Sequence, residues 1–148
     1  MKHTRHADLA LRVLMYLRVA PGRRGSIAAM AEAHRISHNH LDKVVRRMSE
    51  AGLVATVRGR GGGVQLTRDP TTITVGDVMR AMEDDFAVDE CLGPARYCQV
   101  GGVCGARRVF ARALNEYFSV LDGATLEDIA MNDQGLRGAL GLTGRSDQ

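Results

Sequence analysis

The most constraining part of this 148-residue chain is residues 26–52, which predict two short helices separated by a tight turn. Ser26 is a favourable N-cap for a first helix that continues to about Ala33, and Ser37 caps a second helix over residues 38–51. Gly52 ends the second helix, because glycine adopts the left-handed conformation without a steric cost. Two short helices joined in this way indicate a helix-turn-helix.

A glycine-rich hairpin follows the second helix directly. Residues 53–57 have the composition of a strand, and residues 64–66 form the returning strand. The segment 58–63 between them contains four glycines, which allow a very tight turn. A helix-turn-helix followed at once by a hairpin is a winged helix, so the predicted fold class is mostly α with a small β-hairpin.

Further helices are predicted on both sides of this winged unit. Residues 7–19 are apolar at helical spacing, and Pro21-Gly22 ends that helix. Residues 74–83 begin at Thr74, which stands three positions before Asp77 in a variant of the capping box. These helices complete a predicted domain.

The C-terminal part predicts a long helix over residues 105–121 and a short one over residues 125–129. The apolar stripe of the long helix is wider than one buried face needs, so we expect a second subunit to cover part of it. From Gln134 onward glycines recur, and we expect a frayed tail. The predicted divisions are a DNA-binding domain (1–83), a cysteine loop (84–104), a dimerisation helix with a short helix (105–133) and a flexible tail (134–148).

The charge distribution indicates a polyanion-binding half. Residues 1–68 carry a net charge of +9, and residues 69–148 carry −6. In a helix-turn-helix the second helix enters the major groove of double-stranded DNA, and an arginine on a narrow hairpin tip suits the minor groove. The side chains expected to contact DNA are Ser37, His38, Asn39, His40, Lys43, Arg46, Arg47, Arg58 and Arg60.

All three cysteines lie in one segment of the acidic half, as Cys91, Cys98 and Cys104. An odd number of cysteines behind an N-terminus without a secretory signal argues against a disulfide framework. Buried free thiols, a zinc site and an iron–sulfur cluster all remain open from the spacing alone, although the tight pairs typical of structural zinc are absent. A fourth ligand could be a carboxylate, an imidazole, a water or a small thiol, and a side-chain ligand could come from the acids beside the loop or from the first predicted helix. The candidates are His6, Asp8, Asp84, Asp85, Asp89 and Glu90.

Several segments resemble the IscR/NsrR-like family, which are winged-helix bacterial transcriptional repressors that carry an iron–sulfur cluster. The three cysteines follow these segments at the place where the family has its own. The segments are Ala51-Gly52-Leu53-Val54, the glycine hairpin 57–66, Arg68-Asp69-Pro70 and Ile73-Thr74-Val75-Gly76-Asp77-Val78.

The resemblance implies a homodimer that binds a palindromic operator and whose cluster state controls DNA affinity. The cluster-assembly branch of the family has a histidine three residues after the third cysteine, where this chain has Arg107. The resemblance is therefore closest to the members that sense nitric oxide, and it implies a [4Fe-4S] cluster rather than [2Fe-2S]. The expected ligands are Cys91, Cys98, Cys104 and Asp8 from the partner subunit. Asp8 could equally pair with Arg12 one turn along its helix, and these two residues form the expected switch.

Other classes of protein fit the sequence less well. No window is apolar enough to cross a membrane, and no nucleophile–base set or phosphate-binding loop indicates an enzyme. We therefore expect a cytoplasmic regulator. A regulator of iron–sulfur cluster assembly and a zinc or redox-thiol regulator are the alternatives.

Overall fold

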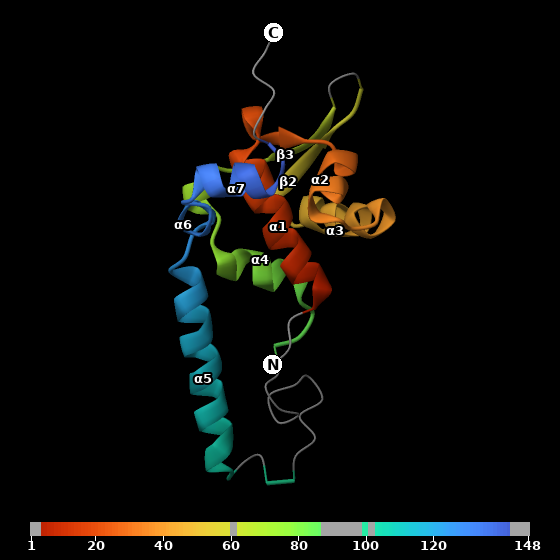
Figure 1. Cartoon of the computed structure of the whole chain (residues 1–148). Coiled ribbons are helices and arrows are strands. Elements are labelled where there is room, and N and C mark those ends of the chain that lie inside the picture. Colours follow the sequence, from red (N-terminus) through yellow and green to blue (C-terminus); the bar gives the residue numbers. More distant parts are fainter. Residues whose placement is uncertain (1–3, 60–61, 87–98, 101–102, 143–148) are drawn as a thin grey trace.

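The structure of the chain is a computed structural model that describes residues 4–59, 62–86, 99–100 and 103–142. Helix α1 (Arg5–Val19) lies at the centre, with the helices α2 (Ile27–His34) and α3 (His38–Glu50) on one side and α4 (Val75–Met82) crossing near its N-terminal end (Figure 1). Thr4 caps α1, with its hydroxyl 3.4 Å from the Ala7 backbone N–H. The helix therefore begins two residues earlier than its apolar periodicity predicts.

The predicted helix-turn-helix is confirmed with its caps. The Ser26 hydroxyl accepts a hydrogen bond from the Ala29 backbone, and the Ser37 hydroxyl accepts one from the His40 backbone. Between the two helices Arg35 adopts the left-handed conformation, with φ 54°. This left-handed residue ends α2, and α3 starts three positions later at His38.

The sheet has three strands where the sequence predicted two. The hairpin strands β2 (Val54–Val57) and β3 (Gly63–Leu66) pair antiparallel, and β1 (Arg24–Gly25) adds to the other edge of β3. A two-residue strand is too short to show alternation, which is why the sequence did not reveal it. Gly25 is required there, because a Cβ would lie 2.6 Å from Cε1 of Tyr16.

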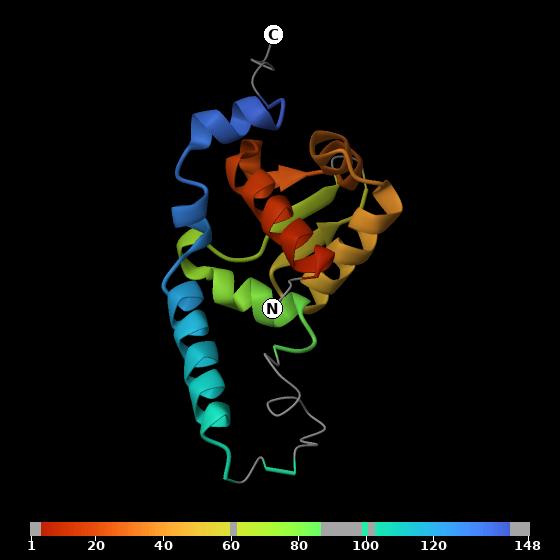
Figure 2. The ribbon, with the colours of Figure 1, turned by 60° about the horizontal axis from the view of Figure 1, so that its bottom comes forward.

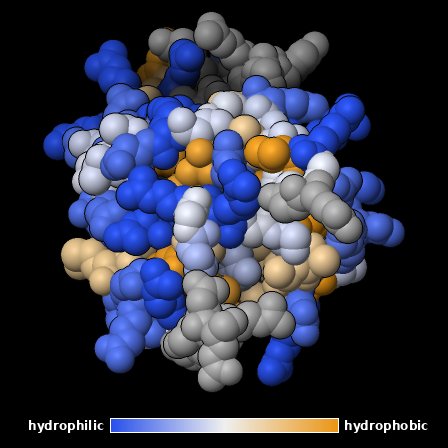
Figure 3. All heavy atoms as spheres, turned by 90° about the horizontal axis from the view of Figure 1, so that it is seen from above, coloured by the Kyte–Doolittle hydropathy of each residue, from blue (hydrophilic) through white to orange (hydrophobic). Residues whose placement is uncertain are grey.

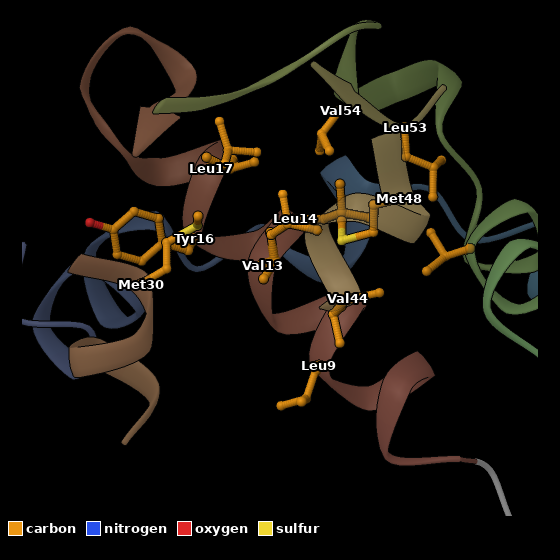
Figure 4. Packing of buried hydrophobic residues seen from close by; sticks show 14 of the residues in the cluster. Leu9, Val13, Leu14, Tyr16, Leu17, Met30, Val44, Met48, Leu53 and Val54 are labelled. Atoms are coloured by element: carbon orange, nitrogen blue, oxygen red, sulfur yellow. The ribbon is translucent and has the colours of Figure 1, made fainter. Parts of the chain in front are cut away.

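The hydrophobic core forms around α1, which has eight buried residues along its 15-residue length. Leu14 and Leu17 of α1, Met30 of α2, and Val44 and Met48 of α3 are all essentially inaccessible to solvent and pack together (Figure 4). Burial of side chains of this size stabilises a fold by roughly 1.5–3 kcal/mol each. The core therefore fixes α3 relative to α1.

The C-terminal part extends beyond this core. The C-terminal end of helix α5 (Gly105–Asp122) contacts α4, and the rest of α5 projects away from the core (Figures 1 and 2). The short helix α6 (Leu126–Ile129) begins at Thr125, whose side chain forms a capping box with Asp128. The caps of α4 and α6 explain why both start where they do.

The end of the chain differs from the expected frayed tail. Residues Asp133–Ala139 form helix α7, which packs against α1. Asn132 caps it, and the half-buried Leu140 and Leu142 contact the core cluster. These two leucines offset the poor helix propensity of the glycines. The surface at this end of the molecule is largely hydrophilic, with small separate apolar areas (Figure 3).

Candidate nucleic-acid interface and cysteine loop

Helix α3 is held by one face and exposed on the other. Leu41, Val44, Val45 and Met48 are at most 1% exposed and pack into the core. Asn39, Lys43 and Arg46 follow one another at helical spacing on the opposite face, and all three are exposed. His38 is exposed as well, next to the N-cap Ser37. A rigidly seated helix with a basic, exposed face is suited to insertion in a DNA groove.

His40 and Arg47 occupy a different flank of α3, where they contact the chain itself. The rings of His40 and His6 meet edge to face, with their centroids 5.6 Å apart. The Arg47 guanidinium donates from Nε to the Ala81 carbonyl at 2.9 Å and from Nη2 to Asp84 Oδ1 at 2.7 Å. These two of the expected DNA contacts therefore face α1 and the end of α4.

The hairpin carries its arginine on an exposed, glycine-shaped tip. Arg58 is exposed, and Gly59 has φ 97°, a conformation that favours glycine. A Cβ on Gly62 would lie 2.3 Å from the Val57 carbonyl oxygen, so the turn can close only around glycine. Arg60 lies outside the described residues.

Of the three cysteines, only Cys104 lies within the described residues. It is a free, half-buried thiol at the N-cap of α5, where the helix dipole favours negative charge such as that of a thiolate. Cys91 and Cys98 lie outside the described residues, and within the described part no three His, Cys, Asp or Glu side chains form a metal-binding group. The chemistry of the donor set, three thiols in one loop, still fits iron, zinc or a cluster.

Asp8 forms the ion pair with Arg12 that the spacing of four residues along α1 allows. Its carboxylate lies 3.0 Å from Arg12 Nε, and both side chains are about half exposed. Burial, together with the charge of Arg12, lowers the pKa of His34 below its usual value. Asp8 is thus accessible at the N-terminal end of α1, and its exposed ion pair with Arg12 is weak enough to exchange.

Sequence reasoning missed the role of Glu83 and assigned Asp84 only a candidate ligand role. Glu83 is 9% exposed, and its Oε1 accepts a hydrogen bond from the Thr4 backbone N–H at 2.6 Å. The Arg47 hydrogen bond and positive charge hold the pKa of Asp84 below its usual range. One signal was available: three consecutive acids follow the C-terminal end of α4, where the helix dipole disfavours negative charge.

Helix α5 is tied to α4 at one end and has none of its residues buried. Arg80 donates two hydrogen bonds to Asp122, at 2.6 and 2.8 Å, and its guanidinium lies 4.2 Å above the ring of Phe118. Val109 is 64% exposed and Val120 is 72% exposed. The chain therefore leaves apolar surface along α5 without a partner in the part of the monomer that the structure describes.

The fold and the exposed basic helix define a winged-helix, DNA-binding transcriptional regulator. Residues 3–132 match the Rrf2 family, which is described as an iron-dependent transcriptional regulator. The chain belongs to the Rrf2 family.

Named relatives agree with this class. The chain is 43% identical over 136 residues to the HTH-type transcriptional regulator NsrR of Bacillus subtilis, a match that covers 90% of this chain and 93% of the relative. NsrR of Bacillus licheniformis is 40% identical over 93% of this chain and 97% of its own length. These relatives are named as transcriptional regulators, and the chain is a regulator rather than an enzyme.

Solved structures show the same fold. CymR, the global cysteine regulator of B. subtilis, superposes with a TM-score of 0.70 at 29% identity and covers 88% of this chain and 97% of its own. IscR of T. potens gives a TM-score of 0.67 at 23% identity over 99% of this chain and 94% of its own, a likeness that concerns the fold alone. In the described part of the chain, no helix combines the length and apolarity that crossing a membrane requires.

Proposed function

We propose that this chain is a homodimeric repressor whose iron–sulfur cluster senses nitric oxide, and that reaction of the cluster releases the operator. The observation that carries the proposal is the presence of three cysteines in one segment of a chain that is 43% identical to an NsrR. The exposed basic face of α3 and the exposed valines of α5 support it.

The proposed ligands are Cys91, Cys98 and Cys104, with Asp8 of the partner subunit as the fourth. Thiolates are the usual protein ligands of iron–sulfur clusters, and three of them suit a [4Fe-4S] cluster with one distinct iron better than a [2Fe-2S] cluster. When bound, the cluster supplies iron atoms that react with nitric oxide. Cys104 is held at the start of α5, so this ligand is attached directly to the proposed dimerisation helix.

Asp8 and Arg12 form the proposed switch. In the structure the two side chains pair within α1 at 3.0 Å. An Asp8 that held iron of the partner subunit would no longer pair with Arg12, and it would tie α1 to the partner's cysteine segment. An Asp8 that returns to Arg12 frees α1 from that constraint. Because α1 carries the core that seats α3, this exchange changes how the two recognition helices of a dimer are held.

The dimer and the operator are linked by geometry. The exposed Val109 and Val120 of α5 supply an apolar surface for a second copy of the chain. A two-fold dimer presents two α3 helices to two half-sites, which is why a palindromic operator is expected. His38, Asn39, Lys43 and Arg46 lie on the exposed face that would enter the major groove, with Arg58 on the hairpin.

The proposed functional divisions follow the sequence boundaries. Residues 1–83 form the DNA-binding domain, residues 84–104 bind the cluster, and residues 105–133 form the dimerisation helix with the short helix α6. The flexible tail expected over residues 134–148 is replaced in part by α7, which packs against α1, and residues 143–148 lie outside the described residues.

The test is to purify the chain without oxygen and to measure iron, acid-labile sulfide and visible absorption beside operator binding. We expect about four irons per subunit and tight binding by the loaded protein. Cys104→Ser is expected to lose the chromophore and the regulated binding together. A colourless protein that contains zinc, or that binds the operator only after thiol oxidation, would replace this proposal with a zinc or redox-thiol regulator. A coloured protein that ignores nitric oxide would indicate a regulator of cluster assembly.

A further inference from the structure

The segment Glu83–Phe86, here called the stem, joins α4 to the cysteine-containing segment and contacts three other helices. Glu83 accepts a hydrogen bond from the Thr4 backbone at the start of α1. Asp84 pairs with Arg47 of α3. The ring of Phe86 meets that of Phe118 in α5 edge to face, with centroids 4.8 Å apart. Three of the four stem residues thus contact the start of α1, the recognition helix and the proposed dimerisation helix.

The contact with α3 is made at two points by one side chain. Arg47 Nε donates to the Ala81 carbonyl, which belongs to the last turn of α4 and has no intrahelical partner. Its two terminal nitrogens face the Asp84 carboxylate, at 2.7 and 3.5 Å. A planar guanidinium that binds two acceptors at once fixes both the distance between the two elements it joins and their relative orientation. Arg47 therefore sets how α3 lies relative to the end of α4.

The neighbouring arginine has a different environment. The Arg46 side chain is 81% exposed, and its partner among the described residues is Glu50 on its own helix, at 3.1 Å. The Arg47 side chain is 32% exposed, and its partners are on another element. Two adjacent arginines of the recognition helix thus face different surroundings: Arg46 faces solvent on the DNA side, and Arg47 faces the stem.

We propose that Arg47 is a positioning residue rather than a phosphate contact, and that through Asp84 it makes the orientation of the recognition helix follow the position of the cysteine loop. The inference rests on the proposed function, because it names the route by which the loop reaches α3. A displacement of the stem changes the Arg47 contact directly, without passing through α1. This route is separate from the exchange of Asp8 between Arg12 and the partner subunit.

The first test separates positioning from phosphate binding. Each phosphate contact contributes a slope of about −0.9 to the logarithm of the binding constant against the logarithm of salt concentration. Arg46→Gln is expected to flatten the slope by about that amount per subunit. Arg47→Gln is expected to weaken operator binding and leave the slope unchanged. An equal flattening by both variants would overturn the proposal.

The second test uses Asp84→Asn, whose side chain is 88% exposed and can change without disturbing the core. The readout is the ratio of operator dissociation constants after and before nitric oxide treatment of the loaded protein. We expect the ratio to fall at least fivefold toward one, which corresponds to a coupling at the lower end of the usual range. Treatment with nitric oxide should change the visible absorption of this variant by the same amount as that of the wild-type protein. Glu50→Gln is the matched control, since it breaks the Arg46 pair instead, and its ratio should stay the same.

The outcomes distinguish this inference from the proposed function. An Asp84→Asn protein with an unaltered ratio contradicts the inference while the unchanged protein still responds to nitric oxide. A wild-type protein whose operator binding does not respond to nitric oxide contradicts the proposed function. In that case the salt slopes of Arg46→Gln and Arg47→Gln still decide whether Arg47 is a positioning residue or a phosphate contact.

Discussion

Gly76, in the first turn of α4, leaves the space that the Asp122 carboxylate occupies at the end of α5. A Cβ at position 76 would lie 1.8 Å from Asp122 Oδ1 and 2.9 Å from Nη1 of Arg80, the arginine that binds Asp122. The absence of a side chain at one position therefore permits the ion pair that attaches α5 to α4. This explains physically why glycine stands in the Ile73–Val78 segment on which the family resemblance rests.

Gly76→Ala is expected to displace Asp122 from Arg80 and to loosen α5. Alanine in a helix is favoured over glycine by roughly 0.5–1 kcal/mol, whereas overpacking costs roughly 1–3 kcal/mol, so the net effect is a destabilisation of about 1 kcal/mol. In an Asp122→Ala background the clash with the carboxylate is gone, and Gly76→Ala should instead stabilise by roughly 0.5–1 kcal/mol. Chemical unfolding of the four proteins measures this, and additive effects would contradict the packing argument.

Acid is expected to destabilise the chain in part through Asp69, which caps the turn before α4. Hydrogen bonds from the Thr71 hydroxyl and backbone, and then from Arg23, lower the pKa of Asp69 to about 2 from an ordinary value of 3.8. The unfolded chain therefore binds this proton more readily than the folded chain. The stabilisation is fully present above pH 3.8 and is lost as the pH falls toward 2.

Asp69→Asn should remove that part of the pH dependence. The midpoint of thermal unfolding, followed from neutral pH to acid, is expected to be lower than that of the unchanged protein above pH 3.8 and to converge with it near pH 2. Parallel curves across the whole range would show that the hydrogen bonds of Asp69 do not contribute in this way.

Asn39 is expected to read bases, while Lys43 binds phosphate. Asn39 lies near the N-terminal end of α3 on the exposed face, where a side-chain amide reaches base edges. Asn39→Ala should weaken operator binding by roughly 1–3 kcal/mol and leave binding to random duplex DNA nearly unchanged. Lys43→Gln should weaken both and reduce the salt dependence. Equal losses on both DNAs for Asn39→Ala would place it on the backbone instead.

Asp8→Ala is expected to keep a thiolate-held cluster but to separate its reaction from operator release. The pair with Arg12 is exposed, so its loss should leave the fold intact. Operator binding and visible absorption after nitric oxide treatment provide the measurement. Glu32→Ala, which removes an exposed acid from α2, is the control and should behave like the unchanged protein. An Asp8→Ala protein that releases DNA normally would exclude Asp8 from the switch.

The winged helix was largely predictable because its signals are local. Ser26, Ser37 and Thr74 cap the helices that they were predicted to cap, and the glycine hairpin forms between the predicted strands. What the sequence concealed depends on contacts between distant residues. The strand Arg24–Gly25 exists only through pairing with β3, and α7 is held by leucines packed on the core.

In the candidate DNA-binding site too, local features could be predicted and contacts between distant residues could not. The exposed side of α3 follows from helical periodicity, so Asn39, Lys43 and Arg46 could be placed in advance. Arg47 could not be separated from Arg46 by composition, because its partner Asp84 lies 37 positions away in sequence. The ligand set beyond Cys104 stays a prediction, since Cys91 and Cys98 lie outside the described residues.

The central claim is tested most directly by titrating the loaded protein with nitric oxide in the absence of oxygen, with visible absorption and operator binding followed in the same samples. The account predicts that the brown chromophore bleaches and the operator complex dissociates over the same range of added nitric oxide. A chromophore that bleaches while the protein stays on its operator, or one that does not react, would contradict it.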